Sequence, residues 1–232
     1  MQVTFAGHSA VFLSVEGSVC AIDPWLRGNP ACPAELENPA ALDLIVLTHG
    51  HADHAGDVLR LHAATGATVA CAFELANIFA ELGIPRDRLI DMGKGGTVEH
   101  GPWKVTLTHA QHSNSFDLPD GTSRYAGEAC GAIVRAGDRT VYHAGDTAYF
   151  GDMAWIGARY RPDLAFLPIG DRYTMGPEDA VRAAVAIGAG QSVPVHYATF
   201  PILTATPDTF LQGCAAAGLR AQALAPGESI AA

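Results

Sequence analysis

Short apolar runs, each about the length of a β-strand, alternate with turn residues along most of this chain. In the first part of the chain, the runs cover residues 2–6, 10–15, 19–22, 43–47 and 68–72. Glycine and serine separate several of them, and residues 23–39 contain four prolines. This pattern predicts β-strands joined by turns, with one long ordered loop after the third strand.

Later segments predict helices and a second set of strands. An early helix ends near Thr65, and another covers residues 73–82 and stops at Gly83. A third helix begins at Pro177, because proline and acidic residues suit the first turn, and a fourth covers residues 206–217. Strands are predicted at residues 103–108, 129–135, 139–142, 164–167, 193–195 and, briefly, from Leu219.

The order of these elements predicts the architecture. Strands followed by strand–helix alternation occur twice, on either side of residue 116, and no linker divides the chain. We therefore predict a single α/β domain, residues 1–232, with pseudo-halves at about 1–115 and 116–232. The two halves are expected to pack sheet against sheet, with helices outside, and to bring their turns to one shared edge.

The densest group of polar residues follows the predicted strand at residues 43–47. Residues 48–54 have the sequence Thr-His-Gly-His-Ala-Asp-His, which contains four candidate metal ligands. In an extended segment His49 and His51 leave the chain on the same side, so both can reach one ion. Asp53 and His54 lie where the chain turns into a helix and can face a second ion. Such a cluster at a strand end indicates a functional site.

Three more candidate ligands also stand just past apolar runs: His112, Asp146 and His196. His49, His51 and His112 can hold one ion, Asp53, His54 and His196 the other, and Asp146 can bridge. Two ions about 3.5–4 Å apart can clamp a carbonyl or phosphoryl group. Imidazoles combined with carboxylates suit zinc, iron or manganese. The ions outweigh the two carboxylates in charge, so the centre is expected to attract an anionic substrate.

Composition narrows the class of protein. Of 232 residues, 49% are apolar and 16% charged, which allows a large core. The net charge of -10 argues against nucleic acid or an anionic membrane as the main partner and leaves a small-molecule substrate. Five scattered cysteines without a CxxC pair favour reduced thiols in a cytoplasmic protein, and no signal peptide or membrane span is expected. The sequence leaves open whether the chain forms a homo-oligomer.

Residues 48–54, followed in order by His112, Asp146 and His196, resemble the motifs of the metallo-β-lactamase superfamily. Within it, the chain is similar to small metal-dependent hydrolases related to the ascorbate-6-phosphate lactonases. The matching segments are residues 7–10, 22–25, 143–147, 166–171, 174–180 and 194–197. The resemblance covers almost the whole chain and implies a four-layer αββα sandwich.

The resemblance also implies a hydrolase with two divalent metal ions, zinc before manganese or iron. Metal-bound hydroxide would cleave a small, anionic ester, lactone or phosphodiester, and Asp53, Asp146 and His54 are the candidate catalytic residues. One alternative is a diiron redox or oxygen-handling protein on the same scaffold. Such proteins usually place a glutamate in the HxH region, where this chain has His51. The other alternative is a metal-binding protein without catalysis.

Four further residues are candidates for contacts around the metals. His8 contacts the substrate or a metal ligand, or is a packed turn histidine. His143 lies beside the ligands without being one. Asp171 either orients a ligand histidine or caps the following loop. Tyr197 either points its phenol at developing negative charge or packs in the wall of the site.

His109 is the rival of His112 for the third ligand of the first ion. It alternates with Val105 and Leu107, so its side chain is expected to lie with theirs on the core side of the strand. His112 begins a polar loop and is free to turn toward His49 and His51. The sequence therefore favours His112 as the ligand.

Overall fold

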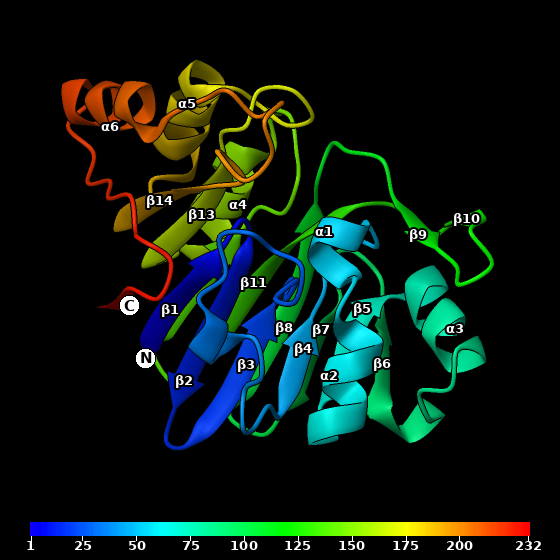
Figure 1. The fold of residues 1–232 in the computed structure, drawn as a ribbon. Coiled ribbons are helices and arrows are strands. Elements are labelled where there is room, and N and C mark those ends of the chain that lie inside the picture. The colour runs from blue at the N-terminus through cyan, green and yellow to red at the C-terminus, as the bar shows by residue number, and fades with distance from the viewer.

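A computed structural model describes residues 1–232, and the first part of the chain builds a mixed seven-stranded sheet together with the last strand. Its strands are β1 (Gln2–Gly7), β2 (Ala10–Val15), β3 (Ser18–Ile22), β4 (Leu44–Val46), β5 (Thr68–Ala72), β6 (Leu89–Met92) and β15 (Ser229–Ala231). β1 to β3 are antiparallel, and β3 to β6 are parallel. β15 pairs with β1, so the two ends of the chain lie side by side (Figure 1).

The second sheet has six strands in the order β14-β13-β12-β11-β8-β7. They are β7 (Thr97–His100), β8 (Trp103–His109), β11 (Cys130–Ala136), β12 (Arg139–His143), β13 (Leu164–Pro168) and β14 (Gln191–Val195). β12, β13 and β14 are parallel. A separate two-stranded ribbon, β9 (Ser115–Asp117) with β10 (Ser123–Tyr125), stands in the loop between β8 and β11.

Helices cover the outer face of each sheet (Figure 1). Beside the first sheet lie α1 (Ala52–Ala55), α2 (Val58–Thr65) and α3 (Phe73–Glu81), with short 3-10 turns at Ala34–Leu36 and Arg86–Arg88. Beside the second lie α4 (Met153–Tyr160), α5 (Pro177–Ile187) and α6 (Pro207–Ala216). None of these helices has the length and apolar character needed to span a bilayer.

Three apolar clusters separate the layers. The central cluster joins the facing sides of the two sheets, for example Leu13 and Leu44 with Leu107 and Val193. A second cluster packs the first sheet on α2 and α3, and a third packs the second sheet on α4, α5 and α6. The layer order is therefore helix, sheet, sheet, helix, which confirms the predicted αββα sandwich.

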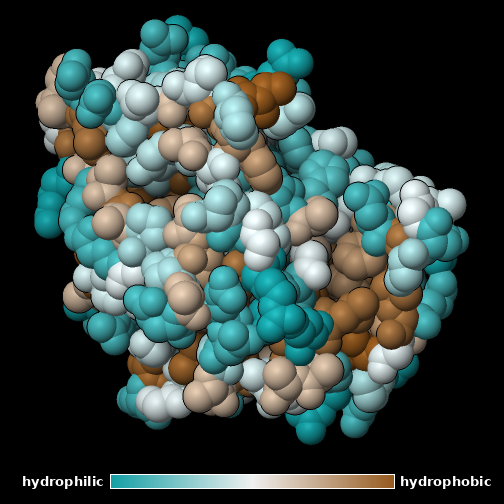
Figure 2. All heavy atoms as spheres, in the orientation of Figure 1, coloured by the Kyte–Doolittle hydropathy of each residue, from teal (hydrophilic) through white to brown (hydrophobic).

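The parallel strands are short apolar runs because both of their faces are covered. All five residues of β5 are buried. Its residue Ala70 points into the central cluster, whereas Val69 and Cys71 point toward the helices. On the face shown in Figure 2, hydrophobic atoms gather between α2 and α3, and most of the remaining surface is hydrophilic or mixed.

Most predicted strands and helices are confirmed within one or two residues, with several differences. The early helix is divided into α1 and α2. Between them, Asp57 is the N-cap of α2, and its side-chain Oδ2 accepts the backbone N–H groups of Leu26 and Arg27 at 2.7 and 2.5 Å. The strand expected from Leu219 is only a bridge between Ala221 and Ser192. β6, β9, β10, α4 and β15 were not predicted. The chain leaves the first sheet at the end of β6 and enters the second sheet at β7. Residues 93–96 therefore connect the two sheets, and they come before the predicted half boundary at 115 and 116.

Candidate metal centre

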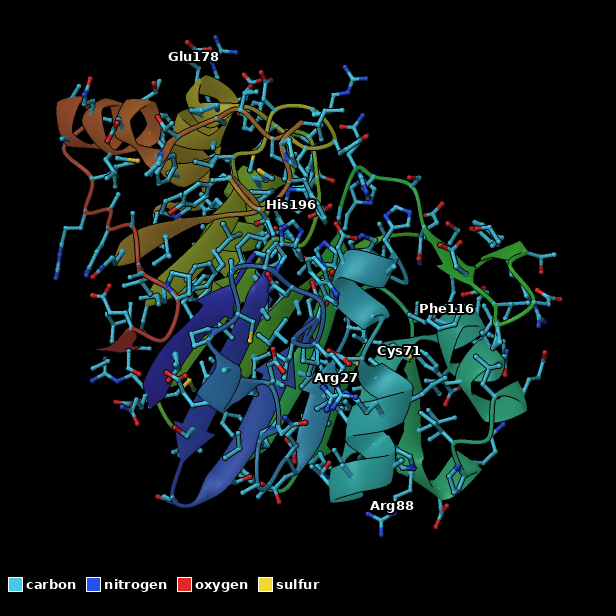
Figure 3. The ribbon with its side chains drawn as sticks, viewed as in Figure 1. Arg27, Cys71, Arg88, Phe116, Glu178 and His196 are labelled. Carbon is cyan, nitrogen blue, oxygen red and sulfur yellow. The ribbon has the colours of Figure 1, made fainter.

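Polar side chains from several turns meet at one edge of the two sheets. The edge is formed by the carboxyl ends of strands that run in parallel, where α/β folds place their ligands. Helix α1 faces the end of β14 there, and Figure 3 shows His196 between them. The contributors are His49 and His51 after β4, Asp53 and His54 in α1, His112 after β8, Asp146 after β12 and His196 after β14.

Three histidines form the first group. Nε2 of His49 lies 3.0 Å from Nδ1 of His51, which lies 3.3 Å from Nε2 of His112. One ring nitrogen from each histidine lies within 4.8 Å of the other two. Three imidazoles around one point are the donor set of a zinc site that keeps an open position.

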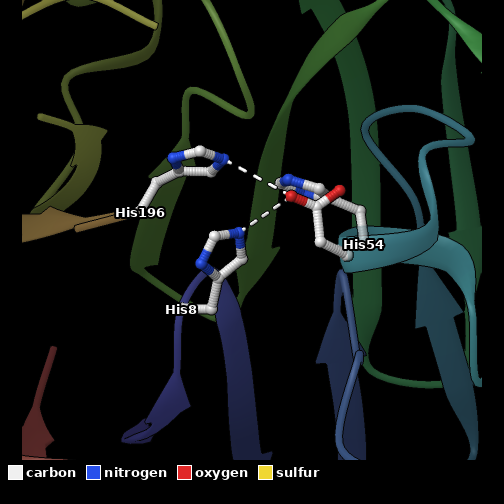
Figure 4. A group of neighbouring side chains, drawn as sticks. His8, His54 and His196 are labelled. Atoms are coloured by element: carbon white, nitrogen blue, oxygen red, sulfur yellow. Dashed lines mark hydrogen bonds and ion pairs between the residues drawn. The ribbon is translucent and has the colours of Figure 1, made fainter. Parts of the chain in front are cut away.

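His8, Asp53, His54 and His196 form the second group, again with one ligand atom each within 4.8 Å of the others. Oδ2 of Asp53 lies 3.1 Å from Nε2 of His8 and 3.6 Å from Nε2 of His196. Figure 4 shows the rings of His8 and His196 joined by dashed lines to one oxygen atom beside His54, which corresponds to these two contacts. The sequence prediction placed Asp53, His54 and His196 together, and the structure adds His8 to them.

Asp146 lies between the two groups. Its Oδ1 is 3.3 Å from Nε2 of His54, and its Oδ2 is 3.0 Å from Nε2 of His196. The same Oδ2 is 3.7 Å from Nε2 of His112 and 4.0 Å from Nε2 of His49. One carboxylate therefore reaches members of both groups, which is the position that a bridging ligand needs.

The buried charges of the site shift the pKa values of its members. Burial lowers the pKa of His54, but the charges of Asp146 and Asp23 outweigh this effect and raise it well above 6.5. The same balance, with Asp146 as the main charge, raises the pKa of His196 to about 9. Burial opposes ionisation of Asp146, yet His196 and His54 hold its pKa well below the usual value. The carboxylates thus attract positive charge strongly.

The residues fit a metal centre by an independent criterion. Nε2 of His54 and Oδ1 of Asp146 are buried and make no hydrogen bond, although they lie 3.3 Å apart. Buried polar atoms almost always have a partner, so unpaired ones require an explanation such as an ion. Imidazole nitrogens and carboxylate oxygens are donors that zinc, iron and manganese accept.

Asp23 supports two of the candidate ligands and was not among the predicted site residues. Its Oδ2 accepts hydrogen bonds from the Thr48 hydroxyl at 2.6 Å and from Nδ1 of His54 at 2.8 Å. The Thr48 hydroxyl in turn lies 3.0 Å from Nδ1 of His49. The sequence signals were an acid directly after a buried strand and its place in the family-like segment 22–25, whereas its positive φ of 47° is visible only in the structure.

Loop contacts fix the remaining ligands. The side-chain oxygen of Asn114 accepts the N–H of Gly50 at 2.8 Å, and this ties the loop after β8 to the turn that carries His49 and His51. A Cβ at Gly50 would lie 2.8 Å from a backbone oxygen, so only glycine fits between the two histidines. The hydroxyl of Thr147 accepts the N–H of Gln111 at 2.9 Å, which joins the His112 loop to the Asp146 loop.

A cavity of about 270 Å³ opens over the two groups. Among the lining residues, Tyr173 and Ser113 are side chains that the sequence did not single out. Tyr173 is 57% exposed and comes from the loop after β13. The walls contain no lysine or arginine, so bound metal ions would supply the positive charge; the lining residues are His51, Asp53, His112, Ser113, Asp146, Tyr173 and His196.

The other predicted contact residues lie outside this cavity. His143 is fully buried and makes backbone contacts, with Nε2 at 2.9 Å from the Ser9 carbonyl oxygen and Nδ1 accepting the N–H of Gly145. Asp171 is exposed and forms no hydrogen bond to a histidine, while its backbone N–H binds the Met175 carbonyl. Tyr197 is half-buried against the third apolar cluster. None of these three side chains lines the cavity over the candidate ligands.

The expected position of His109 is wrong. Its side chain is exposed rather than on the core side, with Nδ1 at 3.1 Å from the Lys94 ammonium and the ring against Phe150. Val105 and Leu107 are buried in the central cluster, whereas His109 is the last residue of β8 and is not part of that cluster. His112 alone of the two rivals reaches the first group.

Comparisons with known proteins extend over the same region. A family model described as the beta-lactamase superfamily domain matches residues 20–197, which include every candidate ligand except His8. A metal-dependent hydrolase of Desulforamulus reducens is 43% identical over 210 residues, 90% of each chain. One from Bacillus cereus is 44% identical over 234 residues, 99% of each chain. The solved structure of a metallo hydrolase from Ignicoccus hospitalis is 36% identical, with a TM-score of 0.86, and the alignment covers 99% of this chain and 97% of that one.

Proposed function

The chain belongs to the metallo-β-lactamase superfamily and is a metal-dependent hydrolase, and on this premise we propose that it works with two divalent metal ions on a small anionic substrate. His49, His51 and His112 would hold one ion, and Asp53, His54 and His196 the other. Asp146 would bridge them. The observation that carries this proposal is the position of Asp146, which lies 3.0 Å from His196 and 3.7 Å from His112.

Zinc is the proposed metal, with manganese or iron as alternatives, because five imidazoles and two carboxylates suit borderline ions. The grouped ligands contain histidine and aspartate but no glutamate. The glutamate expected of diiron oxidoreductases is therefore missing, and hydrolysis is the better supported chemistry. When bound, two such ions acidify water and neutralise charge on the oxygen of the group under attack.

The protein side chains have distinct roles in this proposal. The Asp53 side chain is 25% exposed, and it faces the cavity, so it can orient a water molecule or accept its proton. Asp146 is 3% exposed and keeps the two groups at a fixed separation. His54 is fully buried between Asp23 and Asp146, which hold its ring in place, so its role would be that of a metal ligand in a fixed orientation.

The cavity limits the class of substrate. Its volume of about 270 Å³ is slightly below the usual range of small-molecule sites, which begins at about 300 Å³. With two dications and the carboxylates Asp53 and Asp146, the site carries a net positive charge before substrate binds. We therefore propose a small ester, lactone or phosphodiester with an anionic group. The five free cysteines support a reducing, cytoplasmic setting.

A substrate panel tests this function. Protein stripped of metal and reloaded separately with zinc, manganese or iron(II) is assayed with esters, lactones and phosphodiesters, each in anionic and neutral forms. We expect turnover to follow metal content and to favour the anionic forms. Turnover that persists after stripping would refute the metal-dependent mechanism. A fully loaded protein that cleaves none of the panel would instead support the non-catalytic alternative.

A further inference from the structure

We propose that His8 is a fourth side-chain ligand of the second metal site, together with Asp53, His54 and His196. This inference rests on the proposed two-metal function and refines it. It makes the two sites unequal, because the second has four side chains and Asp146, whereas the first has three histidines and Asp146. The first site is then the more open one, and the second is expected to bind its ion more tightly.

The backbone around His8 is held in an uncommon conformation. His8 lies in the turn between β1 and β2 with a φ of 56°, and Gly7 before it has a φ of 100°. Non-glycine residues with positive φ are uncommon and persist where the surroundings fix them, often at functional sites. A Cβ at Gly7 would lie 2.9 Å from Ala31, and the His8 carbonyl accepts the N–H of His196 at 2.8 Å. The turn is therefore fastened to the second group itself.

The hydrogen bonds of His8 allow Nε2 to be the free ring nitrogen. The Thr199 hydroxyl lies 3.2 Å from the Tyr197 carbonyl oxygen and 2.9 Å from Nδ1 of His8, and when it donates to that carbonyl it accepts from Nδ1. In that arrangement Nδ1 carries the hydrogen, and Nε2 of the neutral ring presents a lone pair. That lone pair faces Oδ2 of Asp53, another acceptor, at 3.1 Å. A cation held by both atoms resolves this conflict.

The distance between these two atoms suits shared coordination. Neighbouring ligand atoms at about 2.0–2.1 Å from a five-coordinate ion lie about 2.9–3.6 Å from each other. Nε2 of His8 and Oδ2 of Asp53 are 3.1 Å apart, and dashed lines in Figure 4 join the rings of His8 and His196 to the same oxygen atom. The centroid of the His8 ring lies 4.1 Å from that of His196 and 5.7 Å from that of His54. His8 is therefore a neighbour of all three other ligands.

Aromatic side chains close the outer side of His8. Trp25 and Phe200 contact its ring edge-on, with centroids 5.4 and 5.5 Å away, and they stack on each other at 5.5 Å. The His8 side chain is fully buried, so its orientation is fixed and water is excluded from that side. Such a dry wall closes the second site on the side of His8, which is absent from the lining of the cavity, whereas Asp53 and His196 line the cavity together with His51 and His112.

The rival arrangement is that His8 only holds Asp53 by a hydrogen bond. Loss of such an outer partner typically weakens metal binding by about 10–100-fold, whereas loss of a direct ligand exceeds that range and changes the coordination itself. His8→Asn is the suitable variant, because asparagine tolerates positive φ better than most residues. His109→Asn is the matched control, since His109 is exposed at the end of β8 and absent from both groups.

The test uses cadmium-113 as the probe. NMR of the protein loaded with two equivalents is expected to show two resonances, and His8→Asn should shift or abolish one while the other stays. Competition with a chelator should show that site weakened by more than about 100-fold. His109→Asn should match the wild type. Two unshifted resonances in His8→Asn, or a weakening of 100-fold or less, would overturn the proposal.

The outcomes separate this inference from the proposed function. A single bound ion in the wild type would contradict the two-metal function. If the one resonance of that ion still moved in His8→Asn, His8 would nevertheless be its ligand. If His8→Asn does not fold, His8→Gly carries the test, because glycine adopts positive φ readily and offers no ligand atom. We again expect the loss or shift of one resonance and a weakening of more than about 100-fold, and a weakening of 100-fold or less would overturn the proposal.

Discussion

Oδ2 of Asp23 lies 2.8 Å from Nδ1 of His54, and both side chains are fully buried. This hydrogen bond turns the His54 ring so that its other nitrogen, Nε2, faces Asp146 at 3.3 Å. The same carboxylate accepts the backbone N–H and the hydroxyl of Thr48, next to His49. One acid outside the ligand set therefore orients a candidate ligand in each group.

We expect Asp23→Ala to weaken metal binding by about 10–100-fold, because an outer partner that orients a ligand is lost. It should also lower the free energy of unfolding by several kcal/mol, since each donor left unpaired in the core costs about 1–3 kcal/mol. Urea unfolding of the metal-free protein and chelator competition measure the two effects. Asp91→Asn, at an exposed position of β6, is the control. Wild-type values in Asp23→Ala would show that the ligands orient themselves.

The wild-type protein should bind two metal ions per chain. Elemental analysis after loading with zinc or manganese gives the ratio directly. Ligand binding to the folded state alone adds about 4 kcal/mol at a free concentration of 1,000 times Kd, so the loaded protein should also unfold at a higher temperature. A reproducible ratio of one or less in folded protein would exclude the two-metal centre.

Asp146→Ala should abolish turnover and weaken both metal sites while the fold survives. The reason is that this carboxylate lies near His54 and His196 on one side and near His49 and His112 on the other. Turnover, metal content and circular dichroism are measured on the same preparation. If turnover and metal affinity stayed at wild-type values, Asp146 could not be the bridge.

His112→Ala and His109→Ala form a matched pair. His112→Ala should lose turnover and at least one ion, because its ring nitrogen belongs to the first group. His109→Ala should keep both, and because the side chain is exposed its stability should change by no more than about 0.5 kcal/mol. Metal content, thermal midpoint and turnover are compared. Loss of metal in His109→Ala with retention in His112→Ala would reverse the assignment.

The native protein should react slowly with thiol reagents at pH 8. Burial raises the pKa of Cys32, Cys130 and Cys214 to about 11 each. Only the thiolate reacts, so alkylation should be on the order of 100-fold slower than for an unperturbed thiol. The rate should rise about tenfold per pH unit until the pH approaches 11, because a raised pKa delays ionisation. Iodoacetamide labelling followed by mass spectrometry checks this, with urea-unfolded protein as the control.

Sequence patterns located most of the strands and the residues that follow them. A strand buried on both faces needs a short apolar run, so β4, β5 and β13 could be recognised from local composition alone. The dense cluster at residues 48–54 and the later His112, Asp146 and His196 stood directly after such runs. Their grouping at one edge follows from parallel pairing, because parallel strands end on the same side.

Contacts between distant segments decided the rest, and no local pattern contains them. His8 approaches Asp53 across 45 positions of sequence, and Asp23 approaches His54 across 31. His109 has the alternation of a core residue, yet it lies exposed at the end of β8, where it contacts Lys94 and Phe150. The sequence by itself determined which donor atoms are available and where they follow strands. Only the packing of the two sheets decided which of them meet, because distances between residues far apart in the chain are set by tertiary contacts.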